Sequence, residues 1–99
     1  MVYDPGALNA SLAAAVGSDP ALMAELRVAF LESAARQAEL MSRARCDANW
    51  QLAAVRLKSV AASFGVTGLA ALADEALEGA PGDPVVLRKL RAAIDDFAV

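Results

Sequence analysis

Apolar side chains recur every three or four positions through most of the chain, which is the spacing of one face of an α-helix. Segments with this spacing cover residues 20–45, 49–64, 68–78 and 84–97, and a shorter one covers residues 5–16. β-branched residues are too sparse for strands. Because the loops are short, consecutive helices should lie antiparallel. The pattern therefore predicts an all-α fold, an antiparallel up-and-down four-helix bundle with a short additional N-terminal helix, as one domain over residues 1–99.

Capping and turn residues set the expected helix boundaries. Asp19–Pro20 combines an N-cap side chain with a proline that suits the first helical position. Asp47 and Asn49 are two candidate caps for the helix that follows them. Gly65 predicts a helix stop, and Thr67 is then a candidate cap for the next helix.

The helix expected over residues 49–64 has a complete inner face and a separate, partly apolar outer face. Its inner face comprises Trp50, Ala53, Ala54, Leu57, Val60, Ala61 and Phe64. Val55 falls about 160° from Leu57, near the middle of the outer face. Around Val55 lie Leu52, Ser59, Ala62 and Ser63, with Arg56 on one shoulder and Gln51 and Lys58 on the other. Such apolar positions are either ordinary surface residues or a patch that contacts a partner.

Composition narrows the function classes. Of the 99 residues, 25 are alanine and 5% are aromatic, so the core should be thin and closely packed. Nine basic against 12 acidic residues give a net charge of −3, which argues against general nucleic-acid binding because phosphate backbones require a basic surface. The chain has no histidine, which excludes histidine-based acid–base catalysis, imidazole metal ligands and phosphohistidine. We expect no enzymatic activity, no metal and no cofactor.

The chain also carries indications of its compartment. Cys46 is the single cysteine, so no internal disulfide forms, and a small chain without disulfides suits a reducing cytoplasm. No positive charge precedes an apolar run at the N-terminus, unlike a signal peptide. The longest charge-free window, residues 59–73, is shorter than the roughly 20 apolar residues that a membrane span needs. We therefore expect a cytoplasmic protein that does not enter a membrane.

Leu57, Lys58 and Ala61, in the helix expected over residues 49–64, and Gly65 just after it form a spaced motif. The motif resembles the signature helix of histidine-containing phosphotransfer (HPt) domains, in which His-x-Leu-Lys-Gly-x-Ala is followed four residues later by glycine. HPt domains are small helical bundles that relay phosphoryl groups in bacterial two-component signalling. The resemblance extends over roughly residues 18–97: the segments around Asp19–Pro20, Leu26 and Phe30-Leu31, and around Leu69, Leu72 and Glu78, look like the family's neighbouring helices.

Two departures from the family pattern change the function that the resemblance implies. Val55 occupies the position of the phosphorylated histidine, and Ser59 replaces the glycine after Leu-Lys. Valine has no nucleophilic or titratable group, so it cannot carry a phosphoryl group. The hydroxyls of Ser59 and Ser63 have no general base beside them, and alcohol phosphoesters do not pass phosphate on readily. The resemblance therefore implies an HPt-like fold that has lost its relay chemistry.

What would remain is a docking surface. In the family this face contacts a response-regulator receiver domain or a histidine kinase. Residues 36–58 carry a local net charge of +3, whereas residues 74–83 carry four acids and no base. A basic and apolar side would steer an acidic partner, and Lys58 is the residue expected to face an acceptor pocket. Alternatively, these charges are solvated helix faces with i,i+4 pairs such as Glu39–Arg43.

The resulting hypothesis is an HPt-like adaptor or inhibitor that docks without carrying phosphate. Its partner-binding residues would be Leu52, Val55, Arg56, Lys58, Ser59, Ala62 and Ser63. An alternative is a structural helical module that self-associates as a homodimer through the same outer face. A third possibility is a working phosphotransferase, but it would need an activated nucleophile, and we find none in the sequence.

Four other features are expected to be structural. Asp74–Glu75 and Asp95–Asp96 are adjacent carboxylates, but neighbouring helical residues diverge and do not form a catalytic or metal pair. Cys46 has no histidine partner and should be a buried or loop-edge small residue. Trp50 should anchor the core rather than stack on a ligand.

Overall fold

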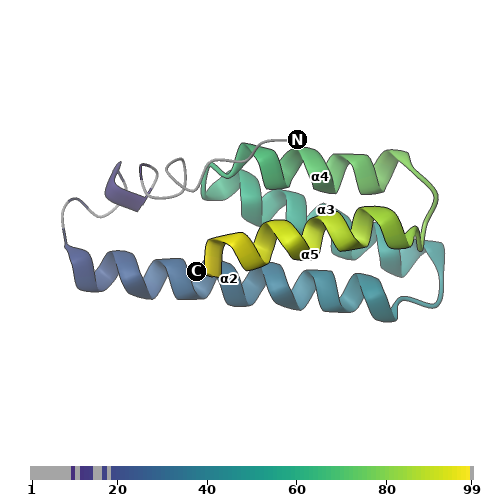
Figure 1. The fold of residues 1–99 in the computed structure, drawn as a ribbon, viewed down its shortest axis with the longest axis horizontal. Helices are drawn as coiled ribbons and strands as arrows, with labels where there is room; N and C mark the ends of the chain where they lie inside the picture. The colour runs from purple at the N-terminus through teal and green to yellow at the C-terminus, as the bar shows by residue number, and fades with distance from the viewer. Residues whose placement is uncertain (1–9, 11, 15–16, 18, 99) are drawn as a thin grey trace.

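The computed structural model describes residues 10, 12–14, 17 and 19–98. Its four main helices are α2 (Pro20–Arg43), α3 (Asp47–Ser63), α4 (Thr67–Glu78) and α5 (Pro84–Ala98). Successive helices run in opposite directions, and α5 returns to pack against both α4 and α2, which closes the ring (Figure 1). The prediction of an all-α, antiparallel up-and-down four-helix bundle is confirmed.

The short N-terminal helix is described only in part. Residues 10 and 12–14 are helical, and Leu12 is buried in the core. The rest of the segment predicted over residues 5–16 lies outside the described residues. The N-terminal part of α2 extends past the ends of the other three main helices (Figure 1). No helix in the described ranges is long and apolar enough to cross a membrane.

The helix starts agree with the expected caps in one case and differ in another. Asp19 caps α2, because its Oδ1 accepts hydrogen bonds from the backbone N–H groups of Ala21 at 3.1 Å and Leu22 at 3.3 Å. The expectation that Asp47 or Asn49 caps α3 was wrong. Cys46 occupies the cap position without a side-chain hydrogen bond. Asp47 is instead the acid of the first turn, where it is placed favourably toward the positive end of the helix dipole.

Gly65 ends α3 as predicted, but the next helix begins without a side-chain cap. Gly65 has a φ of 71°, which favours glycine, and its N–H donates to the carbonyl of Ala62 at 3.1 Å. The N–H of Val66 reaches the carbonyl of Ala61 at 2.8 Å, which completes a Schellman motif. Val66 is buried, so the chain is fixed there and Thr67 is already the first helical residue. The prediction that Thr67 is a cap was wrong.

The core among the described residues is entirely apolar and rich in small side chains. Every residue of the predicted inner face of α3 is buried or half-buried. Phe30 of α2 lies at its centre, with ring centroids 5.1 Å from Phe64 and 6.0 Å from Phe97. Buried alanines at the helix contacts allow the backbones to approach closely; they are Ala34, Ala38, Ala53, Ala54, Ala61, Ala73, Ala76 and Ala93.

Candidate functional site

The outward face of α3 is the surface that the sequence singles out. Val55 is 47% exposed and Leu52 is 49% exposed, whereas Leu57 on the opposite side of the same helix is completely buried. Ser59, Ala62 and Ser63 continue the exposed face toward the end of α3. One helix thus holds Leu52, Val55, Ser59, Ala62 and Ser63 on its exposed side, because its inner face is fixed by the core.

Lys58 lies at the edge between α3 and α4. Its Nζ is 2.7 Å from Oδ1 of Asp74 on α4, and both side chains are about half exposed. Lys58 is therefore already paired within the chain, where the sequence suggested that it faces an acceptor pocket. A surface pair of this kind contributes about 0–1 kcal/mol. A carboxylate from a partner could thus replace Asp74 at little cost.

Arg56 lies at the other edge, where α3 meets α2. Together with Leu52 it lines a groove of about 300 Å³, and the opposite wall is formed by Leu40 and Arg43 from the last turn of α2. Leu40 is 43% exposed, so three of the large exposed apolar side chains, Leu40, Leu52 and Val55, belong to this side of the bundle. Sequence reasoning on α3 alone missed the contribution of Leu40. The signal was the short α2–α3 loop, which places the end of α2 beside the start of α3.

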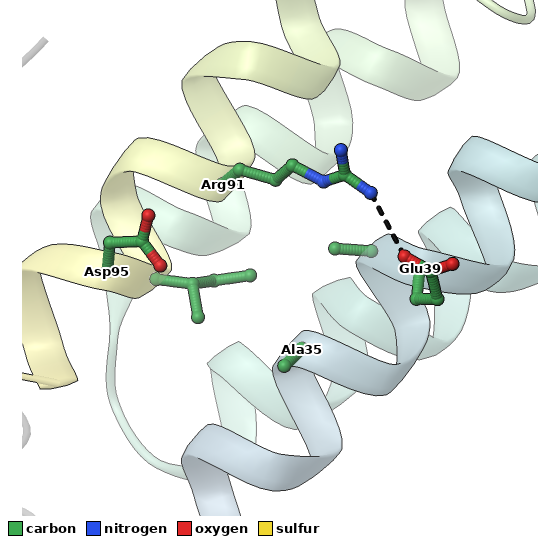
Figure 2. A pocket seen from close by; sticks show the side chains of 6 residues that line it. Ala35, Glu39, Arg91 and Asp95 are labelled. Atoms are coloured by element: carbon green, nitrogen blue, oxygen red, sulfur yellow. Dashed lines mark hydrogen bonds and ion pairs between the residues drawn. The ribbon is translucent and has the colours of Figure 1, made fainter.

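A second hollow, of about 290 Å³, lies between α2 and α5 (Figure 2). Ala35 is part of its α2 wall, and Asp95 lies on the α5 side. Arg91 reaches across from α5, and its Nη2 lies 3.1 Å from Oε2 of Glu39 on α2. The arginine is thus occupied by a carboxylate of the same chain. The hollow presents no nucleophile paired with a base, and it offers no chemistry of its own.

The structural expectations for Asp74–Glu75, Cys46 and Trp50 are met. Asp74 pairs with α3 through Lys58, while the neighbouring Glu75 pairs with Lys89 of α5 at 2.9 Å, so the two carboxylates diverge. Cys46 is exposed in the loop before α3. Trp50 is buried, and its Nε1–H donates to the Ala76 carbonyl at 3.3 Å, which ties α3 to α4.

Within the described ranges, no three cysteine, aspartate or glutamate side chains gather in a cluster that could hold a metal ion. Comparison of the chain with protein-family models, with curated proteins and with solved structures gives no match. The fold and the outward face of α3 are therefore the observations on which a function has to be argued.

Proposed function

We propose that this chain is an HPt-like docking module of bacterial two-component signalling. It binds a response-regulator receiver domain or a histidine kinase without carrying phosphate, and it acts as an adaptor or inhibitor in the cytoplasm. One observation carries the proposal: Val55, at the position that the resemblance assigns to the phosphohistidine, is half exposed on the outward face of a helix in an antiparallel four-helix bundle. This is the placement that a relay imidazole would require.

The chemistry of the same position argues for binding without transfer. A valine side chain is a hydrocarbon without a lone pair, so it cannot attack a phosphoryl group. The chain contains no histidine that could act in its place. Ser59, one helical turn after Val55, adds a side chain where the family pattern has glycine. The proposed face therefore offers an exposed helix surface for a partner to contact, but position 55 has no atom that can accept a phosphoryl group.

The charge of this side supports an acidic partner. Arg56 and Arg43 lie at the α2 edge of the face and Lys58 at its α4 edge, with Leu52 and Val55 between them. A receiver domain presents an acidic pocket ringed by apolar residues, which matches a basic and apolar surface. Such complementarity raises the association rate and sets the orientation of the complex.

The test is a binding screen with purified receiver domains and histidine-kinase modules from the source organism, followed by radiolabelled phosphate transfer from each active kinase. The proposal expects saturable binding to at least one of these proteins and no label retained on the chain. Absence of binding throughout the screen would contradict docking. Acid-labile label on the chain would contradict the loss of relay chemistry.

A second candidate function is self-association through the same side. The observation that favours it is the group of exposed apolar residues Leu40, Leu52 and Val55, which could meet their own copies in a symmetric dimer. Light scattering of the wild type and of Val55→Glu separates the two functions. A dimer that becomes a monomer on substitution supports self-association, and a wild-type monomer supports docking on another protein.

A further inference from the structure

Three of the four edges between neighbouring helices are bridged by an ion pair. Lys58–Asp74 joins α3 to α4, Lys89–Glu75 joins α4 to α5, and Arg91–Glu39 joins α5 to α2. Among the residues that the structure describes, no ion pair joins α2 to α3. The groove of about 300 Å³ lies at that edge. The α2–α3 edge therefore differs from the other three in its electrostatics.

Both walls of the groove carry a cation and an exposed leucine. Arg43 and Leu40 come from α2, and Arg56 and Leu52 come from α3. No carboxylate of the described residues lines the groove. Nε of Arg43 is 4.0 Å from Glu39, but Arg91 holds the other oxygen of Glu39 at 3.1 Å, on the α5 side of α2. Two guanidinium groups thus face a groove whose described lining contains no acid, which favours an anionic occupant.

The architecture also limits the shape of the occupant. The described residues contain no strand, so a partner cannot add a strand to a sheet edge here. A groove between two packed helices accepts the side-chain ridge of a third helix. An amphipathic helix bound in this way presents apolar anchors at i, i+3, i+4 and i+7. Leu40 and Leu52 suit apolar anchor residues of such a helix, and Arg43 and Arg56 suit acidic residues beside those anchors.

We propose that the α2–α3 groove binds an acidic amphipathic helix of the partner protein. An apolar side chain of that helix packs between Leu40 and Leu52, and its carboxylates accept hydrogen bonds from Arg43 and Arg56. The inference rests on the proposed function and deepens it, because it moves part of the docking surface from α3 onto α2 and states the chemistry of the partner segment.

The test uses a fluorescently labelled synthetic helix of about 18 residues, or five turns, with leucines at i, i+3, i+4 and i+7 and glutamates beside them. A second peptide has lysine in place of each glutamate. Anisotropy titrations with the full chain should give saturable binding of the acidic peptide below about 1 mM and far weaker binding of the basic one. In NMR spectra of the isotope-labelled chain, addition of the acidic peptide should change the amide chemical shifts of Asn49 and Leu52, which line the groove.

Charge-reversal variants locate the site. Arg43→Glu and Arg56→Glu should each weaken binding of the acidic peptide about tenfold, because attraction becomes repulsion in a groove that excludes part of the solvent. Arg88→Glu is the matched control: it changes the net charge equally on an exposed position of α5, which packs on α2 and α4. It should change the affinity by less than about twofold.

Equal binding of the two peptides, no saturable binding, or insensitivity to both groove variants would overturn the inference. So would wild-type dimers that lose their association with Arg56→Glu, because the groove would then hold a second copy. The outcomes are separable from those of the proposed function. If the acidic peptide binds in the groove but no two-component protein binds the chain, the groove inference is supported and the signalling role is refuted. If a two-component partner binds, and Val55→Glu weakens that binding whereas Arg43→Glu does not, the proposed function is supported and the groove inference is refuted.

Discussion

Replacing Val55 with glutamate puts a carboxylate in the middle of the outward face of α3 while leaving the core untouched. Val55 is 47% exposed, so the folded chain already leaves about half of the side chain in water. Glutamate forms helices better than valine. A substitution at such a position changes the free energy of unfolding by no more than about 0.5 kcal/mol.

The expected loss of partner affinity follows from the same exposure. Complete burial of a valine is worth about 1.5–3 kcal/mol, so burying the exposed half contributes roughly 1 kcal/mol to binding. Glutamate loses this contribution and places a negative charge against an acidic partner. We expect a total loss of about 1.5–3 kcal/mol, which corresponds to a roughly tenfold to hundredfold increase in Kd.

Val85→Glu provides the matched control, because Val85 on α5 is 46% exposed and lies away from the outward face of α3. Urea unfolding followed by circular dichroism measures stability, and isothermal titration calorimetry against the bound receiver or kinase measures affinity. If Val55→Glu lowers the unfolding free energy by more than about 2 kcal/mol, the side chain is needed for folding and the assignment of the face is refuted. Equal affinities of the two glutamate variants would refute docking through Val55.

Three further substitutions test the packing that holds the face in place, each by urea unfolding. Phe30→Ala removes the ring at the centre of the aromatic cluster and should cost about 3–5 kcal/mol; a cost below about 1 kcal/mol would contradict its central position. Trp50→Phe loses the hydrogen bond to the Ala76 carbonyl and should cost about 1–3 kcal/mol, and no change would mean that the bond is not formed. Gln37→Met removes a buried amide oxygen without a hydrogen-bond partner and should raise stability by about 1 kcal/mol; a loss of stability would show that this oxygen is satisfied.

The helices and their inner faces could be predicted from the sequence, because apolar residues at helical spacing lie on one side of a helix and that side packs into the core. The inner face of α3, from Trp50 to Phe64, followed from counting residues around Leu57. Burial of Ala38 could not be predicted, because alanine is frequent throughout this chain and is only weakly hydrophobic. The caps at Asn49 and Thr67 failed because tertiary packing, including burial of Val66, fixed the helix starts without side-chain hydrogen bonds.

The candidate site could be predicted only where it belongs to one helix. Exposure of Val55 and Leu52 follows from the helical period of α3. The partner of Lys58 is Asp74 on a different helix, and the groove needs Leu40 and Arg43 from α2. Those contacts depend on the handedness and rotation of the packed helices, which the spacing of apolar residues within one helix does not encode.

The most direct measurement is an NMR titration of the isotope-labelled chain with the receiver domain or kinase module that the binding screen identifies. If the outward face of α3 is the docking surface, the largest changes in amide chemical shift will occur at Leu52, Val55 and Ser59 and will extend across the α2–α3 edge to Arg43. Shifts concentrated on α4 and α5, with the amides of α3 unchanged, would contradict it.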